Sequence, residues 1–408
     1  MDRLRKAALC AAFATVAAPP STAATDALTL ERALALARER APRILAAGVR
    51  VEEARGRLAG ASIVLRENPV LEAGAGRRFS DERDTLDAAA ALHQSFELSG
   101  QRGARIAGAE AGVELASARR DESLRRLLRD VGRAFYRGLH AGETLRVATS
   151  SEALTAEVAR IAERRHGAED VPVLDVNVSR AALSRARAER EAAEAERASV
   201  LGDLRILLGM EGEEALELAG HLRHRRSFDP AALLARARER ADLRALEARL
   251  AEAEAELRLA RAEAWPELGI GARWERDERD DVVLGELSIG LPVFDRAQGA
   301  RAEASARVRR LRIELAAARR AAAVEVQTGL LVHARRVRAV EELEASALPL
   351  LDENETLARR SYEAGEMPLA ELLLVRRETL DTRREYLARL LEAAAAAVDV
   401  EASAGTLE

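Results

Sequence analysis

The stretch that decides the fold is Trp265–Phe294, which reads WPELGIGARWERDERDDVVLGELSIGLPVF. Its first part alternates between apolar and polar side chains, and the alternation resumes after the acidic segment at residues 277–281. A period of two is typical of a half-buried strand, and two such runs across a charged turn predict a hairpin. Each run has about ten residues, the length of a tilted strand that crosses a bilayer. The apolar set, which we expect to face lipid, includes Ile270, Trp274 and Ile289.

A second hairpin with the same alternation is predicted at residues 69–98, where charged residues 77–84 separate the two runs. A lone hairpin would leave its edges open, so these strands must pair with further strands. Most of the remaining chain has the composition of long helices, because 33% of its 408 residues are charged, 48% are apolar and only 3% are aromatic. With 64 basic and 69 acidic residues, the charge balance gives no reason to expect a nucleic-acid partner.

The plan of the first half recurs in the second half. Leu34–Arg40 (LALARER) matches Leu234–Arg240 (LARARER), and Pro172 matches Pro368, at a spacing of about 200 residues. Each half is predicted to contain a helix, a hairpin, a very long helix with a coiled-coil seam, a tight turn and a returning helix. The expected units are a first repeat at residues 25–222, with hairpin 69–98 and a turn near 166–172, and a second repeat at residues 223–408, with hairpin 266–293 and a turn near 362–368.

Residues 1–24 have the features of a secretory signal peptide. The basic residues Arg3, Arg5 and Lys6 precede the short apolar run Ala7–Ala18, and small residues follow before the expected cleavage point. We therefore expect an exported chain. No later apolar run reaches the roughly 18 residues of a membrane helix, so any segment that crosses a membrane must consist of strands.

Each chain supplies four predicted strands that have one apolar face. In lipid, only helices and closed barrels satisfy every backbone hydrogen-bonding group. Known barrels begin at about eight strands, so this barrel must be shared: two copies would give about eight strands, three about twelve and four about sixteen. The predicted fold class is mainly α with a membrane β part, and the long helices would extend from the shared barrel as a conduit.

Three segments carry a resemblance to a known family: Leu92–Arg102 (LHQSFELSGQR), Leu291–Arg296 (LPVFDR) and Tyr362–Leu373 (YEAGEMPLAELL). Over residues 28–400 the chain resembles the TolC-type outer-membrane efflux proteins. The first segment is similar to the branch that exports cobalt, zinc and cadmium or copper, although drug-exporting relatives share much of it. The resemblance implies a homotrimer with a twelve-stranded barrel in outer-membrane lipid and a helical tunnel across the periplasm. It also implies two protein partners, a periplasmic adaptor and an inner-membrane pump.

The resemblance also implies functional residues at the tips, the two tight turns with their flanking helix ends. The expected adaptor-docking residues are Arg165, Pro172, Tyr362, Gly365 and Pro368. The first turn departs from the family pattern because Glu169 stands where the family has glycine. Glu371 matches the first of the two acidic residues that line the family's constriction, whereas Leu374 occupies the place of the second. Glu371 also has a simpler interpretation, since an acid near a helix start complements the helix dipole.

Other functions were weighed against a channel. The sequence contains no nucleophile–base–acid pattern, no glycine-rich phosphate loop and no metal-ligand cluster, so we expect no enzyme, cofactor or resident metal. His221 and His224 share a helix face but lack a third ligand. A periplasmic adaptor would carry one coiled-coil hairpin flanked by β-rich domains, and a structural coiled coil would lack the strand pairs. The exported compound, metal ions or other small toxic compounds, stays open at this point.

Overall fold

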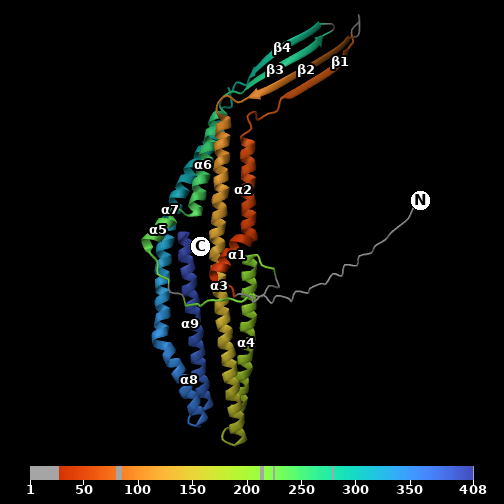
Figure 1. The fold of residues 1–408 in the computed structure, drawn as a ribbon. Coiled ribbons are helices and arrows are strands. Elements are labelled where there is room, and N and C mark those ends of the chain that lie inside the picture. The colour runs from red at the N-terminus through yellow and green to blue at the C-terminus, as the bar shows by residue number, and fades with distance from the viewer. Residues whose placement is uncertain (1–26, 80–84, 212–215, 224–225, 278–279, 408) are drawn as a thin grey trace, which may run out of the picture.

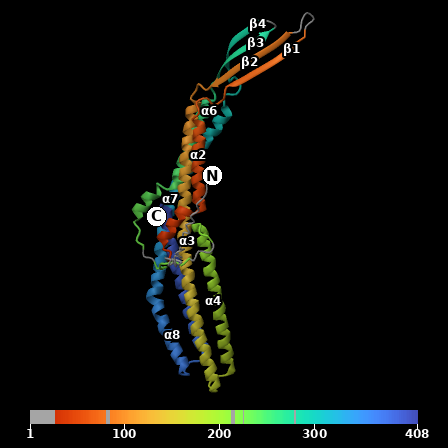
Figure 2. The same cartoon turned by 45° about the vertical axis from the view of Figure 1, so that its right-hand side comes forward.

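A computed structural model of the 408-residue chain describes residues 27–79, 85–211, 216–223, 226–277 and 280–407. The predicted signal peptide, residues 1–24, lies outside the described residues. The molecule is long, with a four-stranded sheet at one end and helices that run from the sheet to two turns at the other end (Figure 1). The rotated view shows the same division into sheet and helices (Figure 2).

The first half contains four helices and two strands. They are α1 (Leu30–Arg40), α2 (Pro42–Ala61), β1 (Val70–Arg78), β2 (Thr85–Phe96), α3 (Gln101–Gly167) and α4 (Val173–Leu208). Pro42 separates α1 from α2 because proline lacks an N–H group and suits the first position of a helix. Helix α3 has 67 residues, which at a rise of 1.5 Å per residue makes it about 100 Å long.

The second half has the same order of elements. They are α5 (Pro230–Ala237), α6 (Ala241–Ala262), β3 (Leu268–Asp277), β4 (Asp280–Ile289), α7 (Gln298–Glu342), the π-helical turn η1 (Leu343–Ala347), α8 (Leu348–Glu363) and α9 (Leu369–Ala404). The counterpart of α3 is therefore interrupted, whereas the sequence pattern predicts one very long helix in each half. Pro349 explains the difference, because it has no N–H group and its ring clashes with the carbonyl group four residues earlier.

The two hairpins pair with each other in one antiparallel sheet of order β1-β2-β3-β4. Strand β2 joins β3 with Leu92 opposite Ala272, and β3 joins β4 with Ile270 opposite Leu287. The predicted strand pairs are thus confirmed, although the strands are shorter than expected, since Leu291 lies beyond the end of β4. Strands β1 and β4 form the two edges of the sheet.

The largest apolar cluster lies where α1, α3, α4 and α9 meet, and it includes Leu34, Phe135, Leu204 and Val398. Gly209 ends α4 there with a φ of +66°, and a Cβ atom on it would lie 2.7 Å from the carbonyl oxygen of Arg40. Only glycine combines this left-handed backbone with such a close approach.

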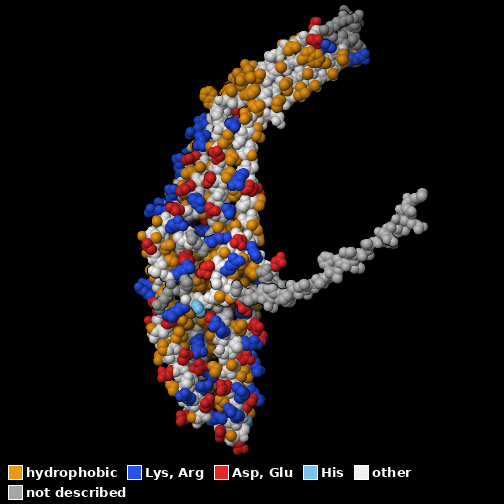
Figure 3. All heavy atoms as spheres, in the orientation of Figure 1, with side chains coloured by type: hydrophobic (Ala, Val, Ile, Leu, Met, Phe, Trp, Pro, Cys, Tyr) orange, Lys and Arg blue, Asp and Glu red, His pale blue; other side chains and the backbone are white. Residues whose placement is uncertain are grey.

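The surface differs between the two ends of the molecule. Hydrophobic side chains gather on the sheet, whereas charged side chains of both signs are spread over the helical part (Figure 3). No helix in the described part of the chain is both long enough and apolar enough to cross a membrane.

Candidate functional site

The second turn, between α8 and α9, is closed by backbone hydrogen bonds. The Gly365 N–H donates to the Tyr362 carbonyl oxygen at 3.1 Å, and the Glu366 N–H donates to the Ser361 carbonyl oxygen at 2.9 Å. Gly365 has a φ of +79°, the left-handed conformation expected of a glycine that ends a helix. Pro368 is the residue that caps the start of α9.

The first turn, between α3 and α4, closes in the same pattern. The Glu169 N–H donates to the His166 carbonyl oxygen at 2.9 Å, and the Asp170 N–H donates to the Arg165 carbonyl oxygen at 2.9 Å. Glu169 therefore occupies the position of the glycine in the second turn, and its φ is +64°. A residue with a side chain is strained in this backbone region, whereas glycine is not. The first turn therefore carries backbone strain that the second turn, with Gly365, does not have. Pro172 caps the start of α4.

Arg165 joins the two turns. Its Nη1 donates to the Tyr362 carbonyl oxygen at 3.1 Å, and its guanidinium carbon lies 5.3 Å from the centre of the Tyr362 ring. This distance is suitable for a cation–π contact. A Cβ atom on Gly365 would lie 3.3 Å from Arg165 Nη2. The structure thus brings together Arg165, Tyr362 and Gly365, whereas Pro172 and Pro368 contribute to the shape of their own turns.

Tyr362 is buried rather than exposed at the tip, with 1% of its surface accessible. It belongs to a small apolar group, here called the tip cluster, that holds α3 against α8 and α9. The members of the tip cluster are Val158, Ile161, Ala358, Tyr362, Leu369 and Leu372. Burial raises the pKa of the Tyr362 hydroxyl above its ordinary value, against the opposing effect of the Arg165 charge. The ring of Tyr362 is therefore a structural support for the turn.

Glu371 lies in the first turn of α9 and is exposed. Leu374, three residues later, is on the same side of the helix and 58% exposed. Within the described chain the Glu371 carboxylate makes no ion pair or side-chain hydrogen bond. An unpaired exposed acid next to an exposed leucine fits a surface that lines a passage, and it fits a helix-start carboxylate equally well.

The sheet has one apolar face and one polar face. Ile270 and Ile289, predicted to face lipid, are 49% and 51% exposed, and they share their face with Trp274. On the opposite face, Arg273 Nε lies 2.6 Å from Glu286 Oε1. The register therefore separates the apolar residues from this ion pair, because successive side chains of a strand alternate between faces.

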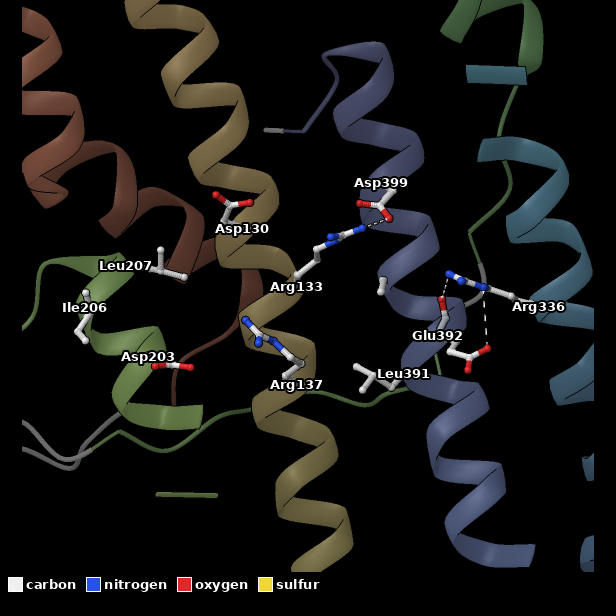
Figure 4. A pocket seen from close by; sticks show the side chains of 11 residues that line it. Asp130, Arg133, Arg137, Asp203, Ile206, Leu207, Arg336, Leu391, Glu392 and Asp399 are labelled. Carbon is white, nitrogen blue, oxygen red and sulfur yellow. Dashed lines mark hydrogen bonds and ion pairs between the residues drawn. The ribbon is translucent and has the colours of Figure 1, made fainter. Parts of the chain in front are cut away.

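A groove of about 730 Å³ lies between α3, α4, α7 and α9 (Figure 4). Its charged groups point toward one another: Arg133 pairs with Asp399, and Arg336 Nη1 donates to the Glu392 carbonyl oxygen at 3.1 Å. Serine, cysteine and histidine are absent from its lining residues. No local sequence pattern predicts this groove, because its lining comes from four helices that are distant in sequence.

The described residues contain no group of three or more histidine, cysteine or acidic side chains placed to hold a metal ion. His221 is described, but its predicted companion His224 lies outside the described residues.

Comparisons with known proteins extend over most of the chain. The cobalt-zinc-cadmium resistance protein CzcC of Cupriavidus metallidurans is 27% identical over 383 residues, which cover 92% of this chain and 89% of that protein. The Campylobacter jejuni outer-membrane channel CmeC has a similar fold, with a TM-score of 0.78 over 92% of this chain and 85% of that one at 16% identity. The crystal structures of CusC give a TM-score of 0.77 over 92% and 91% of the two chains, also at 16% identity. A scan against protein-family models finds no match.

These likenesses identify the class of fold, which is that of the outer-membrane channel proteins. They confirm the resemblance to the TolC-type outer-membrane efflux proteins. The number of copies in the assembled channel, its protein partners and the exported compound stay predictions.

Proposed function

We propose that this chain is one of three identical protomers of the outer-membrane channel of a tripartite efflux system. A periplasmic adaptor would dock at the two tips, and an inner-membrane pump would supply the exported compound. The three sheets would form a shared barrel in the outer membrane, and the paired long helices would form the tunnel that leads to it.

One observation carries the proposal, namely the four-stranded sheet with an exposed apolar face and two edges. Leu71, Val283 and Leu287 on this face are 72%, 75% and 68% exposed, which a protein surrounded by water would not favour over a whole sheet. Each of the two edges must find a partner strand if the sheet lies in lipid. Further copies of the same chain supply such partners.

The same observation weighs against the two alternatives. The strands of the sheet have 9 to 12 residues and are long enough to cross a bilayer. Such a sheet is not expected in a periplasmic adaptor-like protein or in a structural coiled coil. The likeness to CzcC, whose name refers to cobalt, zinc and cadmium, favours metal ions among the possible exported compounds. We expect cleavage of residues 1–24 during export to the outer membrane.

The test has two parts. Mass measurement of the intact protein in mild detergent should give three copies, and membrane fractionation should place them in the outer membrane. Deletion of the gene should raise sensitivity to cobalt, zinc or cadmium salts more than sensitivity to dyes or detergents. A stable soluble monomer with its full β content would refute the shared barrel, and unchanged metal sensitivity would refute the choice of metal ions.

A further inference from the structure

Arg376 of α9 is an unusual buried side chain in the helices near the tips. It is 6% exposed, and its Nε, Nη1 and Nη2 atoms are all buried without a hydrogen-bond partner in the described part of the chain. Arginine keeps its proton in proteins, so this group cannot escape the cost of burial by becoming neutral. A buried charge without hydrogen bonds destabilises the arrangement that buries it.

A guanidinium group only donates hydrogen bonds, so the hydroxyl oxygens around Arg376 are possible acceptors. Ser151, Thr155 and Arg376 line one groove between α3, α4 and α9, and we call these three residues the Arg376 layer. The Thr155 hydroxyl donates to the Ser151 carbonyl oxygen at 2.7 Å, within its own helix. On α9, the Thr379 hydroxyl likewise donates to the Val375 carbonyl oxygen at 3.0 Å. Both hydroxyl oxygens have lone pairs that could accept from a guanidinium group, but in the described part of the chain neither receives a hydrogen bond from Arg376.

The acidic side chains near Arg376 act on it only from a distance. Glu355 of α8 and Glu157 of α3 attract its charge, and Arg359 repels it. Glu355 is held by Arg383, whose Nη2 lies 3.4 Å from Glu355 Oε2. Burial lowers the pKa of Arg376 below its ordinary value in spite of the two acids. The packed arrangement therefore leaves the charge uncompensated.

Two neighbouring features determine how easily α8 and α9 can move away from α3. Immediately toward the turns, the tip cluster of six buried apolar residues holds α3 against α8 and α9, with Met367, Leu373 and Val375 packed against it. At the other end of α8, the π-helical turn η1 interrupts the long helix, and helices often kink at such interruptions. Helix α8 is thus joined to α7 through the π-helical turn η1, and it contacts α3 through the tip cluster.

We propose that the Arg376 layer is a built-in bias against the packed tip, which favours separation of α8 and α9 from α3. Separation gives the guanidinium group water or one of the carboxylates of Glu157 and Glu355 as acceptors. The proposal rests on the proposed channel function for its consequence, which is a tunnel mouth that opens more readily. Its physical basis, the uncompensated charge, is independent of that function.

The test compares three variants of the full-length protein. Arg376→Met removes the charge and keeps an unbranched side chain, and Arg376→Lys keeps the charge. Arg377→Met is the matched control, because Arg377 is the next residue of α9 and its side chain is 76% exposed. Spin labels on cysteines at the exposed positions Arg160 of α3 and Glu363 of α8 report the distance between the two helix ends.

Arg376→Met should reduce the population with long distances at least tenfold, whereas Arg376→Lys and Arg377→Met should keep the native distribution. Equal distributions in the native protein and Arg376→Met would overturn the proposal. If Arg376→Met does not assemble, Arg376→Gln provides the same comparison with a shorter uncharged side chain.

Single-channel recording in a planar bilayer then tests the consequence separately. Arg376→Met should lower the open probability at least tenfold relative to Arg377→Met. A lower open probability without any change in the distances would overturn the proposed bias. Absence of conductance in the native protein, together with the expected distances, would leave the bias supported and would count against the channel function.

Discussion

Replacement of Gly365 by valine should weaken binding of the periplasmic adaptor to the tip without unfolding the protein. The φ of +79° at this position is open to glycine, whereas a β-branched residue there costs about 1–3 kcal/mol of local strain. The new Cβ atom would also lie 3.3 Å from Arg165 Nη2. That contact is the lesser term, because the end of a flexible side chain can move by a few tenths of an ångström.

The strain should be relieved locally, through a change in the turn and loss of the Arg165 contact to Tyr362. The large apolar cluster around Phe135 and the sheet are remote from the turn, so trimer formation and membrane insertion should persist. Export measured as metal resistance should be lost, and binding of the adaptor to the purified channel should weaken.

The first turn provides a matched control. Glu169→Gly places a glycine at a φ of +64° in a turn with the same hydrogen-bond pattern, so it should relieve strain and preserve export. Normal export and normal adaptor binding by Gly365→Val would refute the assignment of the tip as the docking site. Loss of the trimer in that variant would instead show that the turn supports assembly.

Three further predictions concern the sheet, the start of α9 and a partly buried ion pair. Arginine at Ile270 should cost about 2–4 kcal/mol of stability in lipid if this site is near the bilayer midplane, whereas arginine at Glu286 should be tolerated and should change the conductance; equal damage in refolding assays would mean that the faces are assigned wrongly. Glu371→Gln should alter cation preference in bilayer recordings and leave adaptor binding intact, and unchanged selectivity would favour the helix-start interpretation. Burial alone would raise the pKa of Asp242, but its hydrogen bonds to Arg240 hold that pKa below its ordinary value. The stabilisation is therefore present above the ordinary pKa of an aspartate and is lost as the pH falls through the lowered value. Arg240→Met should remove this loss of stability at acidic pH and lower the free energy of unfolding, measured by thermal unfolding, by about 1–3 kcal/mol. If the variant loses stability with falling pH as the native protein does, the assigned role of Arg240 is wrong.

The strands and turns could be predicted from the sequence because their signals are local. A sheet with one apolar and one polar face imposes a period of two, which the segment from Leu268 to Ile289 follows closely. Proline and glycine mark the turns, since the ring of Pro368 fixes its φ and Gly365 can adopt a positive φ that other residues avoid. Alignment of the two halves also predicts that Glu169 stands at the position of the turn glycine.

The contacts between remote segments could not be predicted in the same way. Pairing of β2 with β3 and the contact of Arg165 with Tyr362 join residues from different halves, and no local pattern specifies them. The break at η1 did have a local signal in Pro349, which the repeat pattern outweighed. Arg376 has the appearance of any surface arginine in a charged helix, and only packing reveals that it is buried.

The two halves share one plan but divide its mechanical roles. Helix α3 runs without interruption for 67 residues and ends in a turn that Glu169 holds under strain. Its counterpart is divided by η1 and ends in a turn that Gly365 adopts without strain. A continuous helix transmits force over its whole length, whereas a divided helix can bend at the interruption. Because Arg165 and the tip cluster join α8 to α3 next to the turns, movement of α8 against α3 must break these interactions. The duplicated sequence thus supplies one continuous arm and one interrupted arm, and the difference between them arises from Pro349 and from the residue at the left-handed position of each turn.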